Sequence, residues 1–212
     1  MRNPLFARIY ARASEREGEE QVGQRRETLA GLSGRVVELG AGNGRNFGFY
    51  PGEVGEVVAV EPEPYMRALA VEAAQRSAAD VQVVDGVAGS LPLPDESCDA
   101  AVACLVLCSV PDQREALRDL RRVLRPGGEL RFFEHVHAER QPLRAALAFA
   151  DRSRIWPRLA GGCHASRDTL SAIEAAGFMV ERVRRFDFSP SWPLPALPHI
   201  LGAARRPGGS AP

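Results

Sequence analysis

Three closely spaced glycines at the end of a short apolar segment are the first candidates for chemistry. The run Val36–Gly44 reads Val-Val-Glu-Leu-Gly-Ala-Gly-Asn-Gly. Glycine tolerates a positive φ angle and lets the backbone approach a ligand closely. A strand, a glycine-rich turn and a helix start in this order are typical of a nucleotide-binding loop. The dinucleotide motif G-x-G-x-x-G would require a glycine at position 45, where this chain has Arg45.

An acidic residue ends the next predicted strand. The apolar segment Val57–Glu61 closes with the carboxylate of Glu61. A carboxylate in this place can accept hydrogen bonds from both ribose hydroxyls of an adenosine, and each charge-assisted bond contributes roughly 1.5–3 kcal/mol. A glycine turn alone is often only a tight connection between a strand and a helix. Together with the preceding strand and with Glu61, it favours nucleotide binding.

The elements that must position these residues alternate along the chain. Apolar periodicity predicts strands at 36–39, 57–61, 81–84, 99–105, 130–135, 179–188 and 196–205. It predicts helices at 45–50, 64–76, 113–124 and 167–176, one or two more within 3–32, and partial helix in 138–165. Pro126-Gly127-Gly128 is expected to end the helix at 113–124.

This alternation predicts an α/β fold with a Rossmann-like, doubly wound sheet. The sheet is expected to be seven-stranded and mostly parallel, with helices on both faces and an antiparallel closing strand from the pair 179–188 and 196–205. In such sheets ligands bind beyond the carboxyl ends of the strands. The loops that begin at Gly40, Glu61, Asp85, Cys104 and Glu134 are therefore where chemistry is expected.

Composition limits the classes of partner. The chain has 212 residues, and its 27 basic and 27 acidic residues give no net charge, so nucleic-acid binding is disfavoured. The four cysteines form no C-x-x-C pair and no secretory signal is present, so we expect no disulfide framework, no metal site and a cytoplasmic location. The apolar stretches are too short for an integral membrane segment. Residues 207–212 form a Gly/Pro/Ser tail that is expected to be disordered.

Four segments resemble class I S-adenosylmethionine (SAM)-dependent methyltransferases: VVELGAGNG, VVAVEPEPYMRALA, VDGVAGSLPLPDESCDAAVACLVLCSVPD and LRRVLRPGGELRFFEHV. They are most similar to the type-11 group, which includes the ubiquinone/menaquinone biosynthesis methyltransferases. Within that group, CLVLCSV, EHV, GGCHASRD and PHILGAARR resemble the methyltransferase-like 7 branch, whose members methylate small thiols. The resemblance implies a SAM-binding methyltransferase domain at 34–206 and an N-terminal helical lid at 1–33.

The resemblance also implies a set of cofactor-binding residues. The glycine loop would pass beneath the methionine part of SAM, and the acid before it would orient the loop. The acid at the end of the second strand would bind the ribose, the next loop would flank the adenine, and the end of the fourth strand would offer backbone to the methionine. The set is Glu38, Gly40, Ala41, Gly42, Asn43, Glu61, Pro62, Val87, Ala88, Cys104 and Leu105.

The acceptor side is less defined, because SAM carries an already activated methyl group and a general base is optional. His135 ends the fifth predicted strand and would either position or deprotonate an acceptor, or serve as a structural histidine beside Glu134. His164 would either cap the pocket or belong to a loop before a helix, and Tyr10 would be either a lid residue or a core contact. Trp156 and Trp192 would line an apolar acceptor pocket or fill core.

The sequence therefore predicts a SAM-dependent methyltransferase that acts on a small-molecule acceptor, with a thiol as one candidate. A quinone- or phenol-type methyltransferase and a non-catalytic SAM-binding protein are the alternatives. An NAD-dependent oxidoreductase would share the strand, glycine turn and acid, but Arg45 and the early third glycine speak against it.

Overall fold

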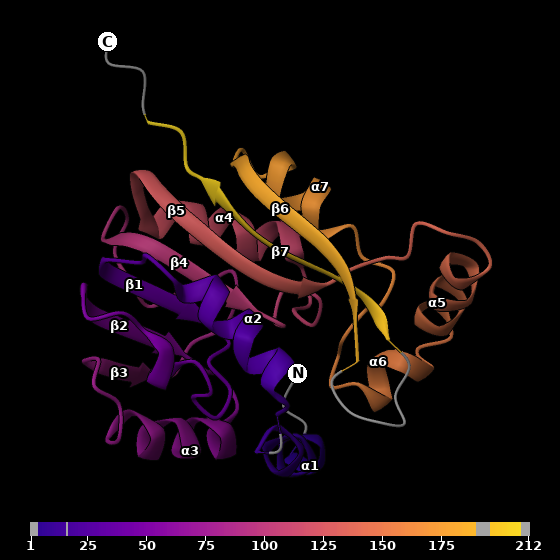
Figure 1. Ribbon diagram of the computed structural model, residues 1–212, viewed down its shortest axis with the longest axis horizontal. Coiled ribbons are helices and arrows are strands. Elements are labelled where there is room, and N and C mark those ends of the chain that lie inside the picture. Colours follow the sequence, from indigo (N-terminus) through magenta and orange to yellow (C-terminus); the bar gives the residue numbers. More distant parts are fainter. Residues whose placement is uncertain (1–3, 16, 190–195, 209–212) are drawn as a thin grey trace.

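A seven-stranded sheet in the order β3-β2-β1-β4-β5-β7-β6 forms the centre of the molecule (Figure 1). The computed structural model describes residues 4–15, 17–189 and 196–208. Neighbouring strands are parallel except at β7, which runs antiparallel to both β5 and β6. The predicted Rossmann-like sheet with its antiparallel closing strand is confirmed. The strands are β1 Gly34–Leu39, β2 Val54–Val60, β3 Val81–Val84, β4 Cys98–Cys104, β5 Leu124–His135, β6 Met179–Phe188 and β7 Leu197–Arg205.

Helices cover both faces of this sheet. In Figure 1, α2 lies in front of the sheet, while α4 and α7 lie behind it. The side chains of Asp112 and Asp168 cap α4 and α7 by accepting bonds from backbone amides of the first turn. The helices are α1 Pro4–Ser14, α2 Glu19–Leu29, α3 Pro64–Ala74, α4 Gln113–Val123, α5 Leu143–Arg152, α6 Ile155–Leu159 and α7 Thr169–Ala175. The helix predicted at 45–50 is only a 3-10 turn, η1, at Phe47–Phe49.

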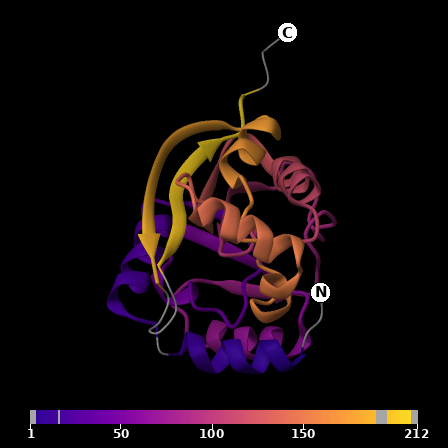
Figure 2. The same cartoon turned by 90° about the vertical axis from the view of Figure 1, so that its right-hand side faces the viewer.

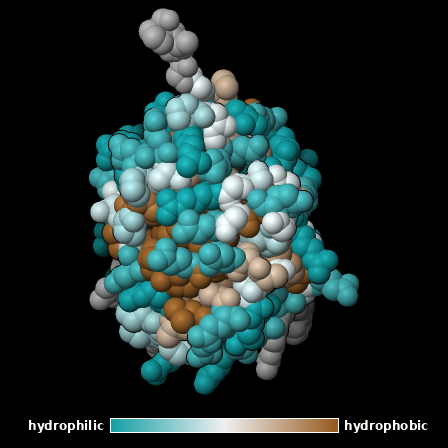
Figure 3. Space-filling view, turned by 90° about the vertical axis from the view of Figure 1, so that its left-hand side faces the viewer, coloured by the Kyte–Doolittle hydropathy of each residue, from teal (hydrophilic) through white to brown (hydrophobic). Residues whose placement is uncertain are grey.

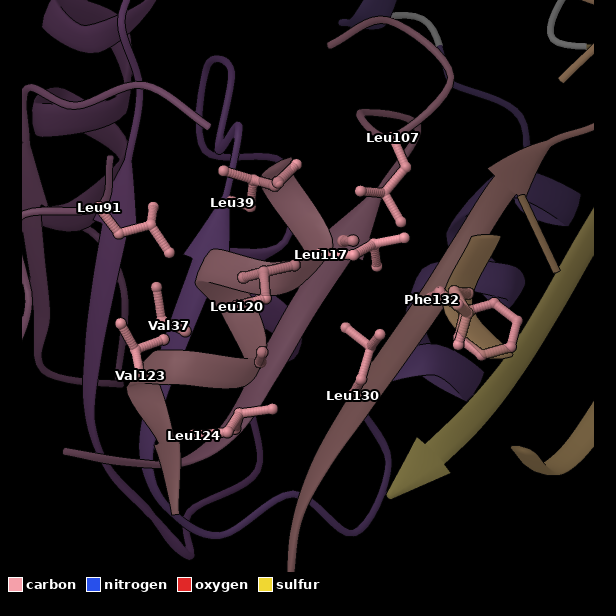
Figure 4. Close-up of a cluster of buried hydrophobic side chains, with 14 of the residues drawn as sticks. Val37, Leu39, Leu91, Leu107, Leu117, Leu120, Val123, Leu124, Leu130 and Phe132 are labelled. Atoms are coloured by element: carbon pink, nitrogen blue, oxygen red, sulfur yellow. The ribbon is translucent and has the colours of Figure 1, made fainter. Parts of the chain in front are cut away.

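The largest hydrophobic cluster lies between α4 and the sheet. Leu117, Leu120 and Val123 project from one side of α4 onto β1 and β5, where they meet Leu39 and Leu130 (Figure 4). All five side chains are buried. Because both faces of the central strands are covered, β4 reads as a nearly continuous apolar run, as parallel sheets require. This packing fixes the strand ends from which the functional loops leave.

The start of β5 corrects the sequence-based prediction. The strand begins at Leu124, directly after α4, and Pro126-Gly127-Gly128 lies inside it. Leu124 is already extended and pairs with Cys98, and a register shift follows in the partner strand between Cys98 and Ala100. A Cβ atom at Gly128 would lie 3.0 Å from the carbonyl oxygen of Asp99. The glycine therefore allows a close approach of the two strands, and it does not end the helix, which stops at Val123.

Two helical segments lie near the carboxyl ends of the parallel strands. Figure 2 shows α5 and α6 in front of this edge and α1 below them, beside α3. Ala7 and Ala11 of α1 pack on Met66 of α3. A Cβ atom at Gly161, just after α6, would lie 2.1 Å from the ring of Phe6, so α1 also contacts the segment after α6. The N-terminal helices thus adjoin the edge where ligands are expected.

The surface is mixed in character. The face seen in Figure 3 is mostly hydrophilic, with a hydrophobic area near its centre. Within the residues that the structure describes, no helix has the length and apolar character needed to cross a membrane. Of the tail that we expected to be disordered, residues 209–212 lie outside the described residues, as does Trp192.

Candidate active site

The glycine bend after β1 is fastened to the end of β2 and is open to a ligand. The backbone amides of Gly40 and Ala41 both donate to the carbonyl oxygen of Val60, at 2.8 and 3.1 Å. Gly40 has a φ of +65°, and a Cβ atom there would lie 2.4 Å from a methyl group of Val106. At Gly42 an added Cβ atom would meet only the terminal methyl group of Met66, at 3.6 Å. The backbone is therefore accessible where the sequence predicts close approach of a ligand.

Glu61 faces this bend. One of its carboxylate oxygens accepts from the amide of Gly42 and the other from the amide of Glu63, both at 2.8 Å. Glu61 is only 7% exposed, and burial raises the pKa of its carboxyl group, although the two amides oppose the shift. Each carboxylate oxygen has a second lone pair and can accept one further bond. The acid is thus fixed beside the bend with acceptor capacity to spare.

Glu38 belongs to a buried polar network that reaches α2. Its oxygens accept from Asn46 Nδ2 at 2.8 Å and from the hydroxyl of Tyr50 at 2.7 Å. Asn46 in turn accepts from Arg25, which forms a buried ion pair with Glu17 at 2.6 Å. Burial, as the largest influence, raises the pKa of Glu38 to about 7. The network ties the N-terminal helices to the loop after β1.

Sequence reasoning missed most of this network. The buried polar residues of α2 follow no apolar period, so nothing in the pattern shows that Arg25 turns inward. Tyr50 was expected only as the end of a short helix. A weak signal exists in Asn46, a polar residue next to a glycine loop, but its partner Arg25 is 21 positions away.

The residues predicted to flank the adenine, and the end of the glycine loop, lie next to Glu38 and Glu61. The amide of Glu61 donates to the carbonyl of Val84, which joins the ends of β2 and β3. Beyond β3, Val87 is 53% exposed and Ala88 packs partly on the core, while Pro62 is half-buried. The side-chain amide of Asn43 donates to Ser14 at 2.9 Å, so this predicted cofactor residue anchors the end of α1.

The loop after β4 is held by a buried carboxylate at the end of β5. Glu134 accepts from three consecutive amides, those of Val106, Leu107 and Cys108, at 2.9 to 3.1 Å. Just before them, Leu105 has a φ of +56°, an uncommon conformation for a side chain of its size. This arrangement fixes the backbone at the predicted methionine-binding residues Cys104 and Leu105. Burial raises the pKa of Cys104 to about 12, so its thiol is neutral and fits a packing role.

His135 stands at the end of β5 among aromatic rings. It is 4% exposed, and burial lowers the pKa of its imidazole to about 4, so the ring is neutral near pH 7. Its Nδ1 atom lies 3.2 Å from the sulfur of Cys163. The Nε2 atom is buried and has no hydrogen-bond partner among the described residues. The rings of His199 and Trp156 lie 5.2 and 6.5 Å away between centroids, and Nε1 of Trp156 is likewise buried without a partner in the described part of the chain.

Comparison with known proteins shows the family of this chain. A family model described as "Methyltransferase domain" matches residues 37–132. Thiol S-methyltransferase TMT1B of Mus musculus is 37% identical over 207 residues, which cover 94% of this chain and 82% of that protein. The chain belongs to the SAM-dependent methyltransferases. Thiol S-methyltransferase TMT1A of Homo sapiens is 34% identical over 191 residues, covering 84% of this chain and 74% of the relative.

A solved structure supports the fold of this methyltransferase. Geranyl diphosphate methyltransferase in complex with SAM matches with a TM-score of 0.71 at 15% identity, covering 88% of this chain and 84% of that chain. The residues of the loops after β1 and β2 fit the cofactor. The open backbone at Gly42 leaves room for a ligand, and Glu61 retains lone pairs for a diol. Burial of Glu38 and Glu61 also favours a ligand with positive charge, which SAM carries on its sulfonium.

The other two predicted catalytic residues of this methyltransferase occupy different places. The backbone amide of His164 donates to the carbonyl of Cys108 at 2.8 Å, and burial lowers the pKa of its half-buried imidazole. Tyr10 stacks on Phe6, with ring centroids 5.7 Å apart, and burial raises the pKa of its phenol. Both residues therefore adjoin the site. Of the three predicted catalytic residues, His135 alone has a buried ring nitrogen that lacks a hydrogen-bond partner within the described part of the chain.

The described residues contain no group of three His, Cys, Asp or Glu side chains placed to hold a metal ion. The four cysteines form no disulfide, and the thiol of Cys163 lies within hydrogen-bonding distance of His135.

Proposed function

We propose that this methyltransferase transfers the methyl group of SAM to the sulfur of a small thiol. The observation that carries the proposal is the neutral, buried imidazole of His135 with its unpartnered Nε2 atom at the carboxyl edge of the sheet. The names of the curated relatives, both thiol S-methyltransferases, give the acceptor class independent support. Four unpaired cysteines are in keeping with a reducing compartment, and we infer a cytoplasmic location.

We infer that the cofactor is held mainly by the loops after β1 and β2. The backbone of Gly40, Ala41 and Gly42 would support the methionine part, and Glu61 would accept bonds from the ribose hydroxyls. Glu38 would act through the loop that it orients, and Val87 would flank the adenine. Residues 1–33 would form a lid, because α1 is bonded to the glycine loop through Ser14 and Asn43 and contacts the segment after α6.

The chemistry required of the protein is small. When bound, SAM supplies a methyl group that its sulfonium has already activated. His135 would accept a hydrogen bond from the thiol at Nε2 and so place the sulfur. A thiol has a pKa near 8.5, far above the value of about 4 for this imidazole, so the thiol would not ionise beforehand. The S–H proton becomes strongly acidic as the sulfur forms its third bond, to the methyl carbon, and a weak base then suffices to take it and leave a neutral thioether.

The test is a product-identifying screen with SAM that carries a labelled methyl group. The purified full chain is incubated with alkyl and aryl thiols, hydrogen sulfide, phenols, quinols and amines, and mass spectrometry locates the label. We expect S-methylated thiols. Label on a quinol carbon or phenol oxygen, with unlabelled thiols, would overturn the thiol proposal and select the quinone- or phenol-type alternative. Micromolar SAM binding without any labelled product would identify a non-catalytic SAM-binding protein.

A further inference from the structure

An exposed basic segment, residues 139–158, lies beside the acceptor side of the site and takes no part in the chemistry described above. We call it the arginine segment. It includes α5 and most of α6. Its five arginines are all exposed, and none has an ion-pair partner among the described residues, whereas arginines elsewhere in the chain form many such pairs. They are Arg140, Arg144, Arg152, Arg154 and Arg158.

The two acidic residues of the arginine segment are already engaged. Glu139 pairs with Arg185 at 3.1 Å. Asp151 accepts from the backbone amides of Ala165 and Ser166, at 3.0 and 2.7 Å, and therefore faces the body of the molecule. The positive charge of the segment is thus not neutralised locally. Since the whole chain has no net charge, this charge is a local feature.

The same segment exposes large apolar side chains. Phe149 is 71% exposed and Leu143 is 41% exposed, and Ala145 and Ala146 are exposed between them. Leu147 is buried and packs in one cluster with Trp156, which fixes the inward side of α5. Phe149 follows Leu147 by two positions and so lies on another side of the helix. An exposed phenylalanine on a helix with unpaired arginines at both ends is typical of an interfacial segment.

We propose that the arginine segment docks this methyltransferase on an anionic lipid surface. Phe149 and Leu143 would enter the boundary of the acyl chains, and the arginines would contact headgroup phosphates. A protein partner fits less well, because one ten-residue helix offers far less than the roughly 800 Å² per partner of a stable interface. In Figure 2 the segment lies in front of the carboxyl edge, so docking would turn the side that holds Trp156 and His135 toward the lipid.

The test is vesicle flotation of the full chain, with vesicles of phosphatidylcholine alone or with about 30% phosphatidylserine. We expect binding to the anionic vesicles that weakens with salt. Phe149→Ser should lower the partition coefficient roughly tenfold or more. Arg154→Gln and Arg158→Gln should each lower it roughly fivefold, since each charge near such a surface contributes about 1 kcal/mol. Matched control variants are Val183→Ser and Arg118→Gln, which change exposed residues outside the arginine segment and should bind like the wild type.

Two results would overturn the proposal. One is a wild-type chain that does not float with anionic vesicles, or that floats no better than its Phe149 and arginine variants. The other is a dimer in sedimentation velocity that Phe149→Ser dissociates, which would assign the face to a second copy of the chain. SAM affinity and thermal unfolding, measured on every variant, separate loss of docking from loss of folding. Vesicle binding, SAM affinity and thermal unfolding do not depend on the methyl acceptor. A failed thiol assay would therefore leave this test unaffected.

Discussion

The two halves of the site differ in how the acids of one and the ring nitrogens of the other are hydrogen-bonded. On the cofactor half, Glu38, Glu61 and Glu134 each accept two or three hydrogen bonds from the protein. On the acceptor half, the described residues leave ring nitrogens of His135 and Trp156 without partners, although both atoms are buried. Buried polar atoms are normally bonded, so an exception indicates a place for a ligand or water. The acids of the cofactor half are therefore held in place before the cofactor binds. The ring nitrogens of the acceptor half are expected to gain hydrogen bonds from a bound ligand or water.

The halves also differ in charge. The cofactor half contains acids with raised pKa values, which suit a ligand with positive charge. The acceptor half contains a cluster of aromatic rings, namely those of Phe133, Phe186, Phe188 and His199. The ring of His199 also stacks on that of His135. A cluster of aromatic rings favours an apolar acceptor and keeps the imidazoles neutral. The contrast predicts that substitutions in one half will affect cofactor affinity, and those in the other half turnover.

Replacing His135 should produce the largest effect and break the acceptor half alone. We expect His135→Ala to lower kcat by about 10²–10⁴-fold, the usual contribution of a placed proton acceptor. The SAM dissociation constant, measured by calorimetry, should stay near that of the wild type. Unchanged turnover would remove His135 from the mechanism, and a large loss of SAM affinity would show that the two halves are not separate.

Glu61→Ala should produce the next largest effect, in the cofactor half. The variant removes the acceptor of the ribose hydroxyls and leaves the amide of Gly42 without its present partner. SAM binding should weaken by about 2–4 kcal/mol. Glu63→Ala is the matched control, because Glu63 is an acid two positions away that only caps α3. The control should keep its SAM affinity and lose about 1 kcal/mol of unfolding free energy. Wild-type SAM affinity in Glu61→Ala would place the cofactor elsewhere.

The cofactor half was more predictable from the sequence than the acceptor half. A glycine turn between a strand and a helix and an acid at the end of the next strand are local signals. Because the carboxyl ends of parallel strands meet at one edge of the sheet, the sequence alone predicts that Gly42 lies near Glu61. Glu134 was predicted as the start of a functional loop and as a neighbour of His135. Its bonds to the loop after β4 could not be predicted, since they span 26 to 28 positions. The inward turn of Arg25 and the contact of Cys163 with His135 likewise depend on tertiary packing.

A smaller effect tests whether the charge of the cofactor half matters for binding. Burial raises the pKa of Glu38 from 4.5 to about 7, so the carboxyl is mostly ionised at pH 8 and mostly protonated at pH 6. A ligand with positive charge favours the ionised form, and SAM affinity should therefore fall roughly tenfold between pH 8 and pH 6. Glu38→Gln cannot titrate and should show a flatter profile.

Protonation of Glu38 should weaken SAM binding but should not destabilise the fold, so the two effects can be told apart. A raised carboxyl pKa destabilises the folded chain above pH 7, and this penalty fades as the pH falls toward 4.5. Protonation of Glu38 thus cannot itself lower the melting temperature of the ligand-free protein between pH 8 and pH 6. Weaker SAM binding over the same range, seen by calorimetry, then reports on the site and not on unfolding. An equally steep profile in Glu38→Gln would move the titrating group away from Glu38, with Glu61, whose pKa is also raised by burial, as the next position to substitute.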